Sequence, residues 1–269
     1  MTGNGFIRRE NEGIPYYACV AFESLAHVRH GFSTRTGGAA TDRGCLLNLS
    51  MRPWDTPERV AENRTRFLLS LGLASARLAT LSQIHSDRVH IIEDTSDQWN
   101  RRQEGDALAT SRSGIAVGVL VADCFPILLA DPDTGAVAAV HSGWRGTAQR
   151  ILSKAVKGMR EAFGSKPARL LAAIGPGIRA CCCEVGPEVA ALYGEKYPGL
   201  NLARLREGHP AKYLLDMPRA LEIQCAESGL HRENVFDIVS CTRCNPQEFF
   251  SHRAEGEAAG RMMALIGRL

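Results

Sequence analysis

The sequence lacks the features that mark a membrane protein or a nucleic-acid-binding protein. Its longest apolar run, residues 114–130, contains Asp123 and Pro126 and is too short to span a bilayer. Lysine and arginine exceed aspartate and glutamate only by 32 − 29 = 3, and they are spread along the chain. We therefore expect neither nucleic acid nor a membrane surface as a partner. No apolar leader opens the chain, which predicts a cytoplasmic location.

Several catalytic signatures are also missing. There is no Walker A loop, no G-x-S-x-G nucleophile elbow and no H-E-x-x-H zinc motif. The P-C-x-x-C half of the nucleobase-deaminase signature is absent, because Ser240 precedes the C-x-x-C pair. The eight histidines are scattered and form no H-x-H pair, which argues against the clustered imidazoles of a multicopper oxidase.

Cysteine is abundant, with nine residues, an odd number, of which 181–183 are consecutive. In a cytoplasmic protein these are expected to be reduced thiols, most of them small buried apolar groups. Cys241 and Cys244 form a lone C-x-x-C. A structural zinc site needs a second pair, and the triple cysteine is a poor partner, so we expect this pair not to bind metal.

Strand-like and helix-like segments alternate along the whole chain. Helices are predicted from about Thr56 to Gly72, after a cap at Thr147, over 216–227, and in the segment after Glu255. A short strand that runs into a glycine loop is predicted over 28–38, and further strands are predicted at 78–83, 89–92, 115–124, 126–131, 136–141, 170–175 and 235–239. This order, with no clear linker, predicts one α/β (α+β) domain over 1–269, a mixed sheet with helices on both faces.

His141 is the most suggestive of the histidines. It ends a buried strand and precedes the loop 142–146, in which glycines allow close approach of a ligand to the backbone. Arg145 and the amides of the following helix are expected to attract an anion such as phosphate. The alternatives are that His141 bonds only to backbone and that Arg145 pairs with a surface carboxylate.

Asp123 and Cys124 form a second signal, because a carboxylate inside an apolar run is costly unless it is paired. Neighbours in a strand point to opposite faces, so both can face one site only if the strand ends there, as Pro126 suggests. With His85, which lies between two strand-like segments, Cys124 and His141 form a candidate catalytic zinc site with an open fourth position. No local spacing enforces that grouping.

Read together, these segments resemble the YfiH/laccase-domain family, also called multicopper polyphenol oxidase-like. The matching pieces run in order from residue 30 to residue 262: 30–35, 37–38, 47–49, 83–85, 105–108, 122–126, 141–146, 174–176, 184–186, 241–242, 249–253 and 260–262. The resemblance implies a three-layer α/β/α sandwich of the YfiH type. It implies a metal, zinc with copper as the alternative, on His85, Cys124 and His141.

The resemblance also implies purine nucleoside phosphorylase activity on adenosine, inosine and methylthioadenosine, with adenosine deaminase activity in the same site. Asp123, Cys124 and His141 would be catalytic. Purine nucleosides and phosphate would be the partners of a monomer or weak homo-oligomer. Substrate-binding roles are implied for Ser33, Arg35, Asn48, Gln83, Trp144 and Arg145.

Three other functions compete with this one. A Cys–His hydrolase would use Cys124 as nucleophile and His141 as base, and would edit the peptidoglycan precursor UDP-MurNAc-L-serine. A copper polyphenol oxidase (laccase) is the older family label, which the histidine pattern disfavours. A non-catalytic nucleotide-binding module would bind a ligand without turnover.

Overall fold

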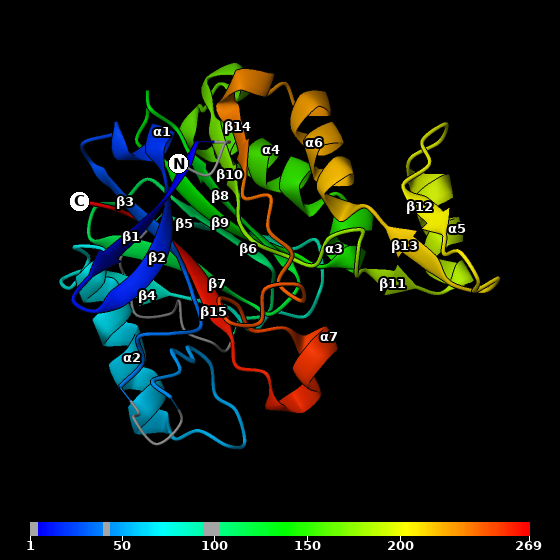
Figure 1. The fold of residues 1–269 in the computed structure, drawn as a ribbon. Coiled ribbons are helices and arrows are strands. Elements are labelled where there is room, and N and C mark those ends of the chain that lie inside the picture. Colours follow the sequence, from blue (N-terminus) through cyan, green and yellow to red (C-terminus); the bar gives the residue numbers. More distant parts are fainter. Residues whose placement is uncertain (1–4, 40–43, 94–102) are drawn as a thin grey trace.

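Two mixed sheets of six strands each face one another, and helices cover their outer faces (Figure 1). The structure is a computed structural model that describes residues 5–39, 44–93 and 103–269. The mixed α/β class with helices on both sides is as the sequence predicts. The sequence predicts a single mixed sheet between the helices, whereas the structure has two sheets packed face to face there.

The first sheet is antiparallel except where β4 and β7 pair in parallel. In spatial order its strands are β1 (Phe6–Asn11), β2 (Ile14–Cys19), β3 (Val28–Ser33), β15 (Met262–Arg268), β7 (Ile115–Val121) and β4 (Arg77–Ala79). The second sheet is antiparallel inside and parallel at both edges. Its order is β14 (Val235–Asp237), β10 (Leu171–Ile174), β8 (Phe125–Ala130), β9 (Val137–Ser142), β6 (Ala107–Thr110) and β5 (Val89–Ile92).

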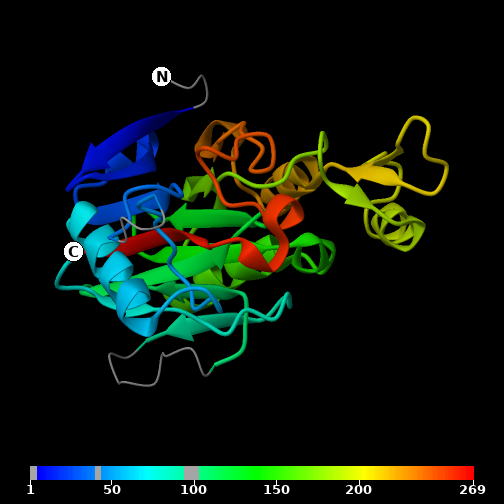
Figure 2. The same cartoon turned by 60° about the horizontal axis from the view of Figure 1, so that its bottom comes forward.

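The helices divide between the two outer faces. α2 (Pro57–Ser70) packs on the first sheet, and α3 (Trp144–Ala148), α4 (Ile151–Phe163) and α6 (Met217–Glu227) pack on the second. Two short helices, α1 (Val20–Glu23) and α7 (His252–Glu255), lie in connections. A small sheet of β11 (Glu184–Val185), β13 (Tyr213–Leu215) and β12 (Ala203–Leu205) projects with α5 (Pro187–Lys196) from one edge, as Figure 2 shows.

The strands β8 and β9 are buried on both faces, which explains their continuous apolar sequence. Along β8, Ile127 and Leu129 pack against the helices, whereas Leu128 and Ala130 pack against the other sheet. This alternation places one residue in two in each core. No helix of the described residues is long and apolar enough to cross a membrane.

Several local predictions are confirmed by specific caps. The side chain of Thr56 accepts a hydrogen bond from the amide of Arg59 at the start of α2, and Gly72 follows that helix with φ 70°. Asp216 caps α6 in the same way, and Gly229 follows it with φ 88°. These boundaries depend on residues next to them in sequence, which is why the pattern predicts them.

The predicted helix after Glu255 is wrong. Only α7 is helical there, ending at Glu255, and the segment continues through a 3-10 turn into β15. The Met, Ala and Leu residues of this segment are good helix formers, but β15 is buried between β3 and β7 and pairs with both. Pairing and burial in the first sheet outweigh intrinsic propensity.

The predicted cap at Thr147 is also wrong. The helix begins at Trp144, after an N-cap at Gly143, and Thr147 lies inside it with its hydroxyl donating to the Gly143 carbonyl. Arg150, with φ 63° in the left-handed region, then interrupts the helical backbone between α3 and α4. A helix as short as α3 has little dipole to offer an anion, so that part of the phosphate argument is lost.

Candidate metal centre and active site

Three residues that are distant in sequence converge at one end of the sheets. His85 lies in a bend between β4 and β5, Cys124 precedes β8, and His141 lies near the end of β9. One nitrogen of each histidine and the Cys124 sulfur lie within 4.8 Å of one another. The imidazole rings meet edge to face with centroids 4.9 Å apart. The cluster predicted from the sequence is therefore present as a geometric group.

Gly143 leaves the space in which this cluster fits. A Cβ at that position would lie 2.6 Å from Nδ1 of His85 and 3.0 Å from the Cys124 sulfur. The first contact is closer than a Cβ tolerates and the second is tight, so glycine leaves the room that the two donor atoms occupy. His85 itself has φ 58°, in the left-handed region. The backbone is thus shaped around the two donor atoms.

Asp106 organises the cluster, and the sequence reasoning did not assign it a role. Its carboxylate is fully buried and accepts a hydrogen bond from Nδ1 of His141 at 2.7 Å. It also accepts hydrogen bonds from the backbone amides of His85 and Ser86 and from the hydroxyl of Ser86. In the neutral ring, Asp106 holds the single proton on Nδ1 of His141, which leaves the Nε2 lone pair for a metal. The only sequence signal was the match at 105–108.

The electrostatics of the three groups differ. Burial, then the neighbouring His141, lowers the pKa of His85, which keeps that ring neutral and able to ligate. Burial lowers the pKa of His141, but Cys124 and Asp106 raise it by more than burial lowers it, and the pKa reaches about 9. Burial raises the pKa of Asp106, but hydrogen bonds from His141 and Ser86 outweigh it and bring the pKa to about 2. Asp106 is therefore a permanent anion behind His141.

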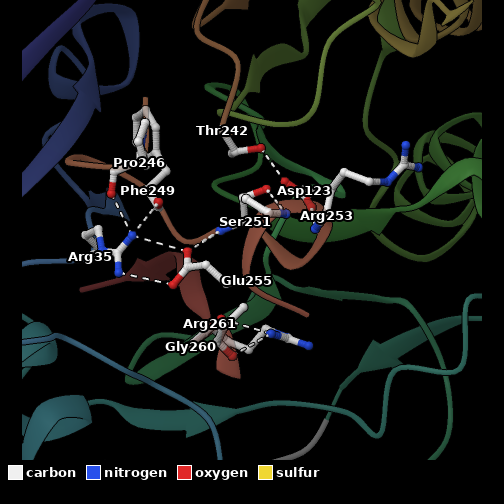
Figure 3. Close-up of polar contacts among 12 residues, drawn as sticks. Arg35, Asp123, Thr242, Pro246, Phe249, Ser251, Arg253, Glu255, Gly260 and Arg261 are labelled. Atoms are coloured by element: carbon white, nitrogen blue, oxygen red, sulfur yellow. Dashed lines mark hydrogen bonds and ion pairs between the residues drawn. The ribbon is translucent and has the colours of Figure 1, made fainter. Parts of the chain in front are cut away.

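Asp123 lies in the turn between β7 and β8, with φ 86°. Its carboxylate accepts the Thr242 hydroxyl and the Arg253 amide, each at 2.6 Å (Figure 3). Since the strand has ended, Asp123 and Cys124 both line one cavity. The turn removes the difficulty that neighbours in a strand point to opposite faces.

Two cavities meet at the His–Cys–His cluster, and His85 and Cys124 line both of them. The first, of about 530 Å³, is polar, and its wall includes Gln83, His141, His252, Arg52 and Arg261. The second, of about 490 Å³, has a more apolar wall that includes Trp144, Ile178, Val189, Met217 and Cys183 together with Asp123, Arg145 and Arg253. The cluster thus faces a cationic space on one side and a largely apolar space on the other.

The predicted substrate-binding residues divide into two groups. Gln83, Trp144 and Arg145 line the cavities, and the Arg145 guanidinium lies 4.3 Å from the centre of the Trp144 ring. The described residues that line the two cavities do not include Ser33 or Asn48. The hydroxyl of Ser33 accepts the Met263 amide, and Asn48 is held in its loop by four hydrogen bonds.

Arg35 is also outside the cavity walls. Its guanidinium forms two hydrogen bonds at 3.2 Å with the Glu255 carboxylate, and it donates to the carbonyls of Pro246 and Phe249 (Figure 3). The geometry therefore gives Arg35 a role in holding the segment before α7 rather than in holding phosphate. Arg52 and Arg261, which the sequence reasoning did not single out, are the guanidinium groups of the first cavity.

Comparisons with known proteins find related sequences and a similar fold. The sequence profile of a family described as multi-copper polyphenol oxidoreductase laccase matches residues 29–269. A purine nucleoside phosphorylase of Deinococcus radiodurans is 39% identical over 242 residues, 89% of each chain. A protein named adenosine deaminase RL5, from an unknown prokaryotic organism, is 35% identical over 88% of this chain and 93% of its own. The crystal structure of YlmD from Geobacillus stearothermophilus superposes with a TM-score of 0.85 at 28% identity, covering 98% of this chain and 99% of that one.

Proposed function

The chain belongs to the multi-copper polyphenol oxidoreductase laccase family, and on that premise we propose that it is a zinc-dependent enzyme that cleaves purine nucleosides with phosphate and also deaminates adenosine. The observation that carries the proposal is the His85, Cys124 and His141 cluster at the junction of a cationic cavity and an apolar one. Relatives named purine nucleoside phosphorylase and adenosine deaminase support the same chemistry.

The donor set suits zinc. Two imidazoles and one thiolate, with room for a fourth ligand, are typical of catalytic zinc sites. The Asp106 carboxylate behind His141 is the usual support of a ligating histidine. Multicopper oxidation needs many more imidazoles, and among the described residues this cluster contains only two. When bound, zinc would supply Lewis acidity and lower the pKa of a bound water toward ~7.

The apolar cavity is the proposed nucleoside site. The Trp144 ring offers a flat surface for a purine, and Ile178, Val189 and Met217 continue the apolar wall. Asp123 brings a carboxylate to the same wall, where it would stabilise positive charge developing on the sugar as the glycosidic bond breaks. The hydrogen bonds from Thr242 and Arg253 fix the position of that carboxylate.

The cationic cavity is the proposed phosphate site. Arg261 is partly buried, and burial, then the neighbouring Arg52, lowers its pKa. Arg52 is already paired with Glu257 on the same wall, at 2.8 Å, so Arg261 is the guanidinium group that a phosphate would meet. Arg145, the candidate from the sequence, lies beside Trp144 in the other cavity, where it would contact the nucleoside instead. Phosphate would then approach the sugar from the side of Arg261.

One observation favours a second function, a Cys–His hydrolase. Cys124 forms a hydrogen bond with His141 and raises the pKa of that imidazole, which is the arrangement of an activated thiol nucleophile. The same sulfur cannot serve fully both as a metal ligand and as a nucleophile. The metal dependence of activity therefore separates the two functions.

The test removes and restores the metal. Protein stripped with a chelator should lose phosphate-dependent cleavage of adenosine, and zinc should restore it, whereas copper should not. Cys124→Ala and His141→Ala should lose the zinc of this cluster together with activity, and the exposed His209→Ala should keep both. Full activity in metal-free protein would overturn the zinc dependence, and a covalent acyl adduct on Cys124 would favour the hydrolase instead.

A further inference from the structure

A second cluster of four cysteines lies outside the site described above. Cys181 and Cys182 come from the loop after β10, and Cys241 and Cys244 come from the loop after β14. All four sulfur atoms lie within 4.8 Å of one another. The sulfur of Cys244 lies 3.4 Å from that of Cys182 and 3.7 Å from that of Cys181. The prediction that the triple cysteine is a poor partner for the C-x-x-C pair is therefore wrong.

The sulfur spacing matches a tetrahedral metal–thiolate site. A zinc–sulfur bond of about 2.3 Å places two sulfurs of a tetrahedron about 3.8 Å apart. A disulfide would bring two sulfurs to about 2.05 Å. The observed separations of 3.4 and 3.7 Å are close to the tetrahedral value. Four thiolates and no nitrogen or oxygen donor is the ligand set of structural zinc.

The two loops are already held in register by backbone contacts. Gly177 and Cys241 form an isolated parallel bridge, and the Thr242 amide donates to the Gly177 carbonyl. The amides of Cys182 and Cys183 both donate to the Arg179 carbonyl, which makes a tight turn around the first pair. Asn245 donates to the Cys241 carbonyl and closes the turn around the second pair. Each cysteine pair is therefore presented by a fixed turn.

The charges around the cluster also suit a thiolate site. A tetrathiolate zinc centre carries a net charge of about −2. Arginines 179, 243 and 253 come from the two loops and from α7, and the Arg253 guanidinium donates to the Cys182 carbonyl. Two carboxylates lie in or next to these loops: Asp237 is paired with Arg179, and Glu184 is paired with Arg206 and Lys212. The remaining positive charge of Arg243 and Arg253 favours a negative centre in these loops, in which Cys241 is buried and Cys181 and Cys244 are exposed.

We propose that Cys181, Cys182, Cys241 and Cys244 bind a second, structural zinc ion. The ion would cross-link the loop after β10 to the loop after β14 at one wall of the apolar cavity. Cys183, next to the first pair, lines that cavity, and Thr242, next to Cys241, donates its hydroxyl to Asp123. The second zinc would thus hold the groups that position Asp123, without contacting the substrate.

The experiment is a metal count on reduced protein that was never exposed to a chelator. Wild-type protein should contain about two zinc ions per chain. Cys244→Ser should lose about one, Cys124→Ala should lose about one, and the combined variant should retain almost none. Cys45→Ser, which alters an exposed cysteine that is not in the cluster, is the matched control and should keep the wild-type count.

A spectroscopic measurement on the Cys124→Ala variant keeps the proposal testable if Cys244→Ser misfolds. Cobalt in place of zinc should show the intense sulfur-to-metal absorption of a tetrathiolate site, because only the four-cysteine cluster remains to bind it. Wild-type zinc near one per chain, all of it lost in Cys124→Ala, would overturn the proposal. So would a disulfide between two of these four cysteines, located by mass spectrometry of peptides from protein prepared without reductant.

Discussion

Asp106 and His141 are joined by a hydrogen bond of 2.7 Å from the imidazole Nδ1 to a carboxylate oxygen that is fully buried. The backbone amide of His141 also donates to the Asp106 carbonyl, at 2.7 Å. The main chain and the side chain of Asp106 therefore fix the position of the His141 ring and the nitrogen that carries its proton. The pair links the centre of the second sheet to the proposed metal.

We expect Asp106→Asn to weaken zinc binding at the His–Cys–His cluster by about ten- to a hundredfold. The amide NH₂ would confront either Nδ1–H of His141 or the donors of Ser86, so one of these hydrogen bonds must be lost. Competition with a chromogenic chelator measures the affinity. Asp131→Asn, equally buried in a turn remote from the cluster, is the control and should keep the affinity. Unchanged affinity in both variants would remove Asp106 from the account.

Two arginine variants distinguish the phosphate site. Arg261→Ala should raise the KM for phosphate about ten- to a hundredfold, since a charge-assisted hydrogen bond contributes about 1.5–3 kcal/mol. Arg145→Ala should raise the KM for the nucleoside more than that for phosphate. Initial rates at varied phosphate and nucleoside give both constants. The opposite pattern would return phosphate to Arg145, as the sequence alone predicts.

Arg35 should behave as a structural residue. We expect Arg35→Ala to lower the free energy of unfolding by about 1–3 kcal/mol, because a largely buried bidentate pair with Glu255 is lost. Arg169→Ala, which removes a pair with Asp133 at the exposed surface, should leave the free energy of unfolding close to that of wild type. Urea unfolding compares the two. Equal losses, or an Arg35 variant of normal stability that no longer responds to phosphate, would contradict this role.

His30 should make the protein sensitive to acid. Burial lowers the pKa of His30 from 6.5 to about 3, and its Nε2 accepts the Cys19 amide, so the folded state holds the ring neutral. Below pH 6.5 the unfolded chain binds a proton that the folded one does not. Stability from this group is therefore complete above pH 6.5 and is lost toward pH 3, by about 1.4 kcal/mol per unit.

The variant His30→Gln, which keeps an acceptor for the Cys19 amide, should flatten that part of the stability curve. His209→Gln, at an exposed position, should leave the curve as in wild type. Chemical unfolding at a series of pH values between 4 and 7 measures the slopes. Parallel curves for wild type and His30→Gln would show that the acid sensitivity arises elsewhere.

Local sequence signals predicted what depends on neighbours and missed what depends on topology. The caps Thr56 and Asp216 lie beside the helices that they begin. The buried strands β8 and β9 can be predicted from their continuous apolar sequence. β15 could not be predicted in this way, because its Met, Ala and Leu residues form a strand only between β3 and β7. The apolar core between the two sheets could not be predicted for the same reason, because it forms only when strands distant in sequence pair.

The sites divide along the same line. His85, Cys124 and His141 were grouped from their chemistry and their positions at strand ends, although no spacing placed them together. Asp106 was missed because one acid in an apolar segment has no local signal for its partner. The four-cysteine cluster was missed because the two loops that carry it become neighbours only when β10 and β14 pair.

The product of adenosine turnover tests the central claim most directly. Zinc-loaded protein is incubated with adenosine, with and without phosphate, and the products are separated by chromatography. We expect adenine and ribose 1-phosphate to appear only when phosphate is present, and inosine to form in either case. The account would be contradicted if the zinc-loaded protein formed neither adenine nor inosine and the His85→Ala variant behaved in the same way as wild type.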